Sequence, residues 1–269
     1  MGDDTTRSDA ERGERETPMS GLERAATIFG AFDATHRELS LAGLVARCGL
    51  PRSTVYRAAE RMAGLGWLDK FGTRYRIGSR LFEIASLAPI RLQLREAVLP
   101  FLHDLHNATM TTVQLGVLEG DRILVVEKIS GHRPMPMLSQ TGGVVPVYCS
   151  ALGRAILAYS DRETVDAVLD AELPQRTPRT LTTKTAILRE LTAVPSRGWA
   201  TEREEGNIGV SCIAAPIFGP LGEVVAAVSV SGPSAAVRAD RIAPAVCMAA
   251  AASSRAYFAA APRMDSALR

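Results

Sequence analysis

Apolar residues recur every three or four positions along the first part of the chain, a spacing that predicts short amphipathic helices. The first predicted helix begins at Gly21. Ser40 is a favourable N-cap for a second helix, and Gly49 is a favourable residue to end it. Pro51 suits the first turn of a third helix, which we expect to cover residues 52–64.

A hairpin is predicted directly after these helices, with extended stretches at 67–70 and 75–77 around a turn at 71–74. Two helices, a tight turn, a third helix and a hairpin form the order of a winged helix-turn-helix domain, which we assign to residues 20–80. In such a domain the first turn of the third helix contacts base edges in the major groove of DNA. The predicted DNA-contacting residues are Arg52, Ser53, Thr54, Tyr56 and Arg57 on that helix, with Lys70 and Arg74 on the wing.

The hydrophobic pattern changes after residue 111, where a period of two predicts strands that alternate with further helices. A sheet built from hairpins is mainly antiparallel, so we expect an α+β domain. A linker helix precedes this domain, and the two together cover residues 81–269. The helix that precedes Gly198 is expected to end early, at Pro195. The predicted helices are 79–109 with an interruption at Pro89, 151–159, one from Asp161, 185–194 and 239–260, and the predicted strands are 112–117, 123–128, 210–218 and 224–231.

Charge separates the chain into three parts. Residues 1–19 carry a net charge of −3 and no hydrophobic period, which predicts a disordered tail. Residues 20–80 carry a net charge of +5, whereas residues 81–269 are neutral. A basic block beside a neutral one is typical of a nucleic-acid-binding module joined to a different domain.

Composition excludes several classes of protein. Apolar residues make up 46% of the chain, yet no apolar run is long enough to span a membrane, and the charged N-terminus is unlike a secretory signal. The four cysteines form no CxxC pair, which argues against a disulfide framework or a zinc site. We therefore expect a cytoplasmic, nucleoid-associated protein that binds double-stranded DNA and not a membrane, without a metal or cofactor.

Several blocks of sequence resemble the isocitrate-lyase-regulator (IclR) family of bacterial transcription factors. Residues 39–57 read Leu-Ser-Leu-Ala-Gly-Leu-Val-Ala-Arg-Cys-Gly-Leu-Pro-Arg-Ser-Thr-Val-Tyr-Arg, and the similarity resumes at 149–155 (Cys-Ser-Ala-Leu-Gly-Arg-Ala), 212–218 (Cys-Ile-Ala-Ala-Pro-Ile-Phe) and 228–233 (Val-Ser-Val-Ser-Gly-Pro). The resemblance implies a GAF-like effector domain that binds a small metabolite, often a carboxylate. It also suggests homodimers that pair into a homotetramer.

The resemblance places the effector pocket at Ala151, Leu152, Val210, Cys212, Ser229 and Ser231, with Glu202 as a further lining residue. Ser150 would cap the helix whose first amides, at 151–153, form an anion-binding site. These groups offer donors without a buried Lys or Arg, so we expect a small organic acid, aromatic rather than glyoxylate, as the effector. The predicted function is a ligand-responsive regulator, a repressor of a catabolic operon, that binds a palindromic operator because each winged helix covers one half-site.

Two alternatives remain open, a small-molecule-binding protein and an enzyme with a vestigial DNA-binding domain. His103 and His106 have the spacing of a metal pair, but no third ligand lies at recognisable spacing. No histidine follows His132, so the order Ser, Asp, His of an α/β-hydrolase triad is impossible after Ser150 or Ser211. We therefore predict no catalytic and no metal-binding residues. The effector, the sign of regulation, the target genes and the choice between dimer and tetramer do not follow from the sequence.

Overall fold

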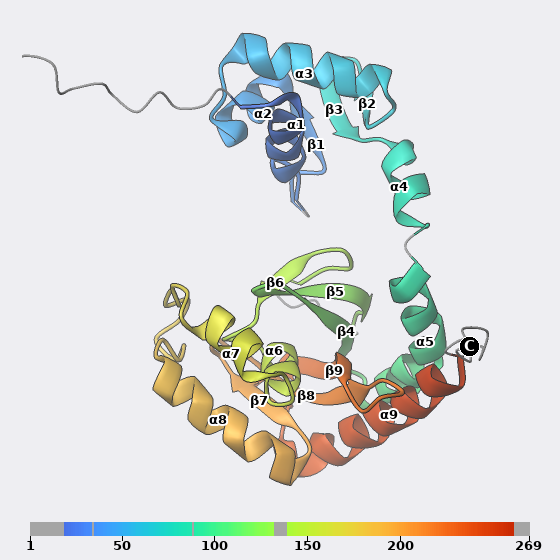
Figure 1. The fold of residues 1–269 in the computed structure, drawn as a ribbon, viewed down its shortest axis with the longest axis vertical. Coiled ribbons are helices and arrows are strands. Elements are labelled where there is room, and N and C mark those ends of the chain that lie inside the picture. Colours follow the sequence, from blue (N-terminus) through green and yellow to red (C-terminus); the bar gives the residue numbers. More distant parts are fainter. Residues whose placement is uncertain (1–18, 34, 88, 132–138, 261–269) are drawn as a thin grey trace, which may run out of the picture. The chain divides into compact units, whose positions relative to one another are not determined.

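The computed structural model describes residues 19–33, 35–87, 89–131 and 139–260, and the chain divides into two compact units between Ala85 and Ser86 (Figure 1). This division falls five residues after the expected boundary, because helix α4 groups with the first unit. The tail predicted at residues 1–19 lies almost entirely outside the described residues.

The first unit packs three helices against a small antiparallel sheet with the strand order β1-β3-β2. Its helix-turn-helix and hairpin follow the predicted order, and strand β1 is an addition that the sequence pattern did not predict. The elements are α1 (Gly21–Gly30), β1 (Glu38–Ser40), α2 (Leu41–Cys48), α3 (Arg52–Gly64), β2 (Leu68–Phe71), β3 (Arg74–Ile77) and α4 (Ser79–Ala85).

Local signals account for the tight turn between α2 and α3. The Ser40 hydroxyl accepts a hydrogen bond from the amide of Gly43 at 3.2 Å, and Gly49 ends α2 in the left-handed conformation with φ of 67°. Val55, Ala59 and Met62 form the buried stripe of α3. The predicted caps of α2, the turn between α2 and α3, and the predicted buried face of α3 are therefore confirmed.

The second unit is built on a six-stranded sheet with the order β6-β5-β4-β9-β8-β7, and every neighbouring pair of strands is antiparallel. This confirms the expected α+β class. The elements are α5 (Pro89–Thr109), β4 (Thr112–Glu119), β5 (Arg122–Ile129), β6 (Val144–Pro146), α6 (Ala151–Leu157), α7 (Arg162–Leu169), α8 (Lys184–Arg197), β7 (Ala200–Arg203), β8 (Val210–Phe218), β9 (Val224–Pro233) and α9 (Ala239–Ala260). Strands β6 and β7 were not predicted.

The prediction that Pro195 ends its helix is wrong. Helix α8 continues through Pro195 to Arg197, and Gly198, with φ of 81°, ends it by donating its amide to the carbonyl of Val194 at 2.7 Å. Proline removes a single hydrogen bond from the last turn, while Val194 still continues the buried stripe of the helix. Packing of that turn therefore outweighs the lost hydrogen bond.

Hydrophobic cores form on both faces of the sheet. Helices α5 and α9 cover one face, where Leu115, Ile213 and Val228 point. Helices α6, α7 and α8 cover the other face, where Ala214 and Ala227 point. Side chains alternate between the two faces along each strand, as the period of two requires.

Two glycines allow α6 to approach its surroundings closely. A Cβ atom on Gly153 would lie 2.2 Å from the carbonyl oxygen of Val147. A Cβ atom on Gly116 would lie 2.5 Å from the Ile123 side chain and 3.0 Å from Leu152 of α6. Helix α6 is therefore held against the sheet at the position where the second unit contains its ligand-sized cavity.

Candidate effector cavity and DNA-contacting helix

The exposed face of α3 carries the residues predicted to contact DNA. Arg52, Ser53, Tyr56 and Arg57 are exposed, Tyr56 to 48%, and Thr54 is half-buried. Neither Arg52 nor Arg57 forms an ion pair with any described residue. Their guanidinium groups therefore retain all their donors for an external acceptor.

The wing residues differ in how far they are already engaged. Lys70 is exposed but its Nζ lies 2.6 Å from Oε1 of Glu60, which also accepts a hydrogen bond from the Tyr75 hydroxyl at 2.6 Å. Hydrogen bonding to Glu60 raises the pKa of Lys70. Arg74 is exposed and forms no ion pair with the part of the chain that is described. A phosphate would bind Arg74 directly, whereas at Lys70 it would compete with Glu60.

A cavity of about 70 Å³ lies in the second unit between the start of α6 and one face of the sheet. This volume is sufficient for several water molecules or a compact organic molecule. All seven residues predicted for the effector site line it, namely Ser150, Ala151, Leu152, Val210, Cys212, Ser229 and Ser231. Sequence reasoning did not find Gln114, Ser139 and Arg176, which also line the cavity, and it gave Glu202 only a secondary place.

A row of polar side chains crosses four strands at the base of this cavity. Gln114 on β4 pairs with Ser229 on β9, while Cys212 on β8 pairs with both Ser231 on β9 and Glu202 on β7. Paired residues on neighbouring strands point to the same face of a sheet. The register therefore brings side chains from positions 114 to 231 into one cavity.

Three buried polar atoms of the cavity wall have no hydrogen-bond partner among the described residues. They are Nε2 of Gln114, Oγ of Ser139 and Oγ of Ser229, and each of these residues is at most 7% exposed. The other end of the Gln114 amide is engaged, because Oε1 lies 3.3 Å from the Ser231 hydroxyl. Since an unpaired buried polar group costs about 1–3 kcal/mol, these donors are suited to a ligand.

The start of α6 offers the cavity fewer free hydrogen-bonding groups than expected. The Ser150 hydroxyl caps the helix by accepting from the amide of Gly153 at 3.1 Å, and it donates to the carbonyl of Val147 at 3.3 Å. It is therefore already engaged within the protein. Arg176, an exposed residue at the cavity wall, supplies a positive charge that the sequence pattern did not place there.

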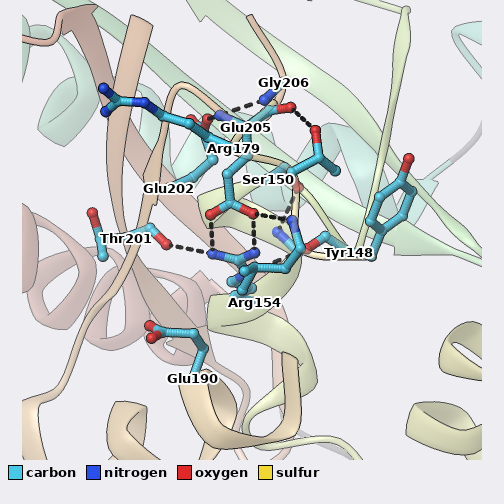
Figure 2. A network of polar contacts seen from close by, with 12 residues as sticks. Tyr148, Ser150, Arg154, Arg179, Glu190, Thr201, Glu202, Glu205 and Gly206 are labelled. Carbon is cyan, nitrogen blue, oxygen red and sulfur yellow. Dashed lines mark hydrogen bonds and ion pairs between the residues drawn. The ribbon is translucent and has the colours of Figure 1, made fainter. Parts of the chain in front are cut away.

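Glu202 is the acidic group of the cavity and is only 3% exposed. Its Oε1 accepts hydrogen bonds from the amides of Glu205 and Gly206 (Figure 2). Burial raises the pKa of Glu202, and the two amide hydrogen bonds partly oppose that effect. Burial likewise raises the pKa of the Cys212 thiol well above its usual range.

A buried ion pair adjoins the hydrogen bonds of Glu202 (Figure 2). Arg154 of α6 and Glu205 form a bidentate pair, with Nη1 of Arg154 2.6 Å from Oε1 of Glu205. Arg154 also donates to the carbonyl oxygens of Tyr148 at 3.2 Å and Thr201 at 3.1 Å. The pair fixes the segment after β7 to α6, and this segment carries Gly206 and Asn207 of the cavity wall.

The described residues contain no group of three His, Cys, Asp or Glu side chains that could hold a metal ion. Nδ1 of His106 lies 2.7 Å from the carbonyl oxygen of Thr111, which accounts for one of the two histidines with metal-pair spacing. No helix within the described ranges has the length and apolar character needed to cross a membrane.

A helix-turn-helix unit followed by an α+β unit whose cavity contains buried polar side chains is the organisation of a DNA-binding regulator controlled by a small molecule. The family model of the bacterial transcriptional regulator IclR C-terminal domain matches residues 88–256, and that of the IclR helix-turn-helix domain matches residues 21–70. The chain belongs to the IclR family of bacterial transcriptional regulators. It is therefore a DNA-binding transcriptional regulator with an effector-binding C-terminal domain.

Similarity to individual proteins covers both units. The transcriptional regulator KdgR of Escherichia coli K12 is 32% identical over 80% of this chain and 84% of that protein. The transcriptional repressor AllR of the same organism is 26% identical over 82% of each chain. A crystal structure of an IclR homologue from Microbacterium hydrocarbonoxydans, complexed with 4-hydroxybenzoate, superposes with a TM-score of 0.81 at 27% identity, covering 89% of this chain and all of that one.

Proposed function

We propose that this chain is a repressor of a catabolic operon and that a small organic acid, bound in the cavity of the second unit, controls its affinity for DNA. The observation that carries the effector site is a set of three buried donors in one cavity, on Gln114, Ser139 and Ser229, that have no partner within the described part of the chain. A carboxylate accepts hydrogen bonds from such donors, and Arg176 adds a positive charge. The Microbacterium homologue is complexed with a small organic acid, 4-hydroxybenzoate.

In this proposal Arg52, Ser53, Thr54, Tyr56 and Arg57 contact bases and nearby phosphates, while Lys70 and Arg74 contact phosphates from the wing. The basic, exposed face of α3 supports this assignment. Since one unit covers one half-site, we propose a homodimer or homotetramer on a palindromic operator. The exposed apolar side chains of Leu22 on α1 and Phe82 on α4 support self-association.

We further propose that the chain is cytoplasmic, associates with the nucleoid and is not an enzyme. The two thiols that could act as nucleophiles are held protonated, since burial raises the pKa of Cys149 to about 11 and that of Cys212 well above its usual range. A protonated thiol is a poor nucleophile. Turnover of any acid by the purified protein, followed by chromatography, would contradict this part of the proposal.

The test combines DNA selection with ligand titration on the full chain. Selection from random duplex DNA should return an inverted repeat, and fluorescence anisotropy then measures its affinity. Arg52→Ala or Arg57→Ala should weaken specific binding by about 1–3 kcal/mol for each lost base contact. An organic acid that binds by calorimetry should change operator affinity by about 1–3 kcal/mol. If both Arg variants kept wild-type operator affinity, the assignment of α3 would be wrong.

A further inference from the structure

Glu60 is an acidic residue on the exposed face of α3 that carries the residues predicted to contact DNA. Residues 53, 56, 57 and 60 have the spacing i, i+3, i+4 and i+7, which places them on one face of a helix. The buried stripe of α3 lies on the opposite side. The homeodomain, another helix-turn-helix fold, contacts bases in the major groove with side chains at this same spacing. Glu60 therefore occupies the fourth position of a face whose other members are Ser53, Tyr56 and Arg57.

Two donors hold one oxygen of the Glu60 carboxylate. Oε1 accepts a hydrogen bond from Nζ of Lys70 at 2.6 Å and another from the hydroxyl of Tyr75 at 2.6 Å. Tyr75 is only 2% exposed, so its ring is fixed in the core of the first unit. Both hydrogen bonds lower the pKa of Glu60, which keeps the carboxylate negatively charged at neutral pH. The charge and the orientation of this group are therefore set before DNA binds.

The second oxygen of the carboxylate, Oε2, has no hydrogen-bond partner within the described part of the chain. The Glu60 side chain is 36% exposed, so a ligand can reach it. An ionised carboxylate only accepts hydrogen bonds, and the phosphate oxygens along DNA are acceptors as well. The group that fits Oε2 in the major groove is therefore the donor of a base edge.

The four bases differ in what they would offer to this oxygen. Cytosine presents only its N4 amino donor in the major groove, whereas guanine presents two acceptors and thymine an acceptor beside a methyl group. Adenine presents a donor next to the acceptor N7, which repels a carboxylate. We propose that Glu60 is a specificity-determining residue of α3 and selects cytosine at one position of each operator half-site. This inference rests on the proposed function, which places α3 in the major groove of an operator.

The experiment repeats the selection from random duplex DNA with the full-length Glu60→Gln variant. The glutamine oxygen can keep both hydrogen bonds of Oε1, and its amide nitrogen then presents a donor in place of Oε2. Cytosine is the base without a major-groove acceptor, so it should change from the favoured to the least favoured base at that position. Fluorescence anisotropy with single-base operator variants measures the change at constant salt. For the wild type, replacing this cytosine should weaken binding about fivefold to hundredfold.

Two further variants separate base recognition from the loss of a charge. Glu60→Ala has no polar group to offer, so the same position should lose its preference. Asp69→Asn is the matched control, because it removes the same charge from an ion pair, with Arg76 at 3.3 Å, in which the acid is 34% exposed. Asp69 precedes Lys70 on β2 and therefore points to the other face of the hairpin. Asp69→Asn should keep the wild-type base preference at every position.

The outcomes distinguish the inference from the function on which it rests. If Glu60→Gln and Glu60→Ala select the wild-type sequence at every position, the inference is overturned and the proposed function stands. A change in salt dependence alone would show that Glu60 only holds Lys70, and it would overturn the inference as well. If Arg52→Ala and Arg57→Ala both bind the operator as tightly as the wild type, α3 does not contact the bases, and the proposed DNA contacts are overturned together with the inference.

Discussion

Replacing Arg154 by methionine should strongly destabilise the second unit. Arg154 is 1% exposed and Glu205 is 6% exposed, so the substitution leaves a buried carboxylate whose remaining partner is the amide of Leu181 at 3.2 Å. The carbonyl oxygens of Tyr148 and Thr201 also lose a donor. Removing one partner of a buried ion pair costs about 3–5 kcal/mol. For a unit of this size that loss lowers the melting temperature by about 6–20 °C.

Tryptophan fluorescence during urea unfolding can isolate this effect. The chain has two tryptophans, Trp67 in the first unit and Trp199 in the second. In a Trp67→Phe background the signal reports the second unit alone. The midpoint for Arg154→Met should move to lower urea with an unchanged slope, because the surface exposed on unfolding stays the same.

Two further variants separate loss of the ion pair from loss of packing. Arg154→Met combined with Glu205→Gln should be more stable than Arg154→Met alone, because no buried charge is then left without a partner. Arg162→Met removes an ion pair whose arginine side chain is 93% exposed, and it should barely move the midpoint. The reasoning is refuted if Arg154→Met costs less than about 1 kcal/mol, or if the double variant is no more stable than the single one.

Three other predictions concern the wing, the close approach of α6 and a buried thiol. Arg74→Ala should lower affinity for any DNA sequence and reduce the slope of log affinity against log salt concentration by about one. Lys70→Ala should have a smaller effect, because that side chain is already in an ion pair with Glu60. Equal effects of the two variants in anisotropy titrations would contradict this difference. Gly153→Ala places a Cβ atom 2.2 Å from the carbonyl oxygen of Val147, so α6 must shift. Urea unfolding should show that the free energy of unfolding falls by about 1–3 kcal/mol. Burial raises the pKa of Cys149 to about 11, so its thiol should react slowly with iodoacetamide in the folded protein at pH 8. The folded state holds this proton more tightly than the unfolded state, so its contribution to stability is complete below pH 9 and is lost as the pH rises towards 11; a free energy of unfolding that increased across this range would be the opposite of the expected sign.

The helices and long strands of the fold could be predicted because their signals are local. Ser40 and Gly49 mark the ends of α2 through their own hydrogen bonds and backbone conformation. The short strands β1, β6 and β7 could not be predicted in this way, because three or four residues carry too little periodicity and, unlike β2 and β3, no tight turn joins them to a partner strand. Their pairing partners on other strands determine them. The end of α8 was misjudged at Pro195 because burial of Val194, a tertiary effect, outweighs the local signal of the proline.

The residues that line the cavity could likewise be predicted only where the sequence carries a local signal or a family resemblance. Six of the seven predicted lining residues belong to blocks that resemble a known family, and Val210 lies two residues before one of these blocks. The register of β8 and β9 brings the four lining residues on these two strands together. Gln114 carries a weak local signal, as a polar residue within an apolar strand. Ser139 and Arg176 carry none, since each lies in an irregular segment whose position depends on the surrounding fold.

The importance of Glu202 depends on contacts between segments that are distant in the sequence. A glutamate on a short edge strand is usually solvated, and nothing in residues 200–206 alone indicates burial. Arg154 lies 51 residues before Glu205, and their ion pair holds the main chain that binds Glu202. Glu202 is only 3% exposed and lines the cavity, although it lies on the edge strand β7. The position of Glu202 in the cavity wall thus depends on an ion pair between two side chains that do not line the cavity themselves.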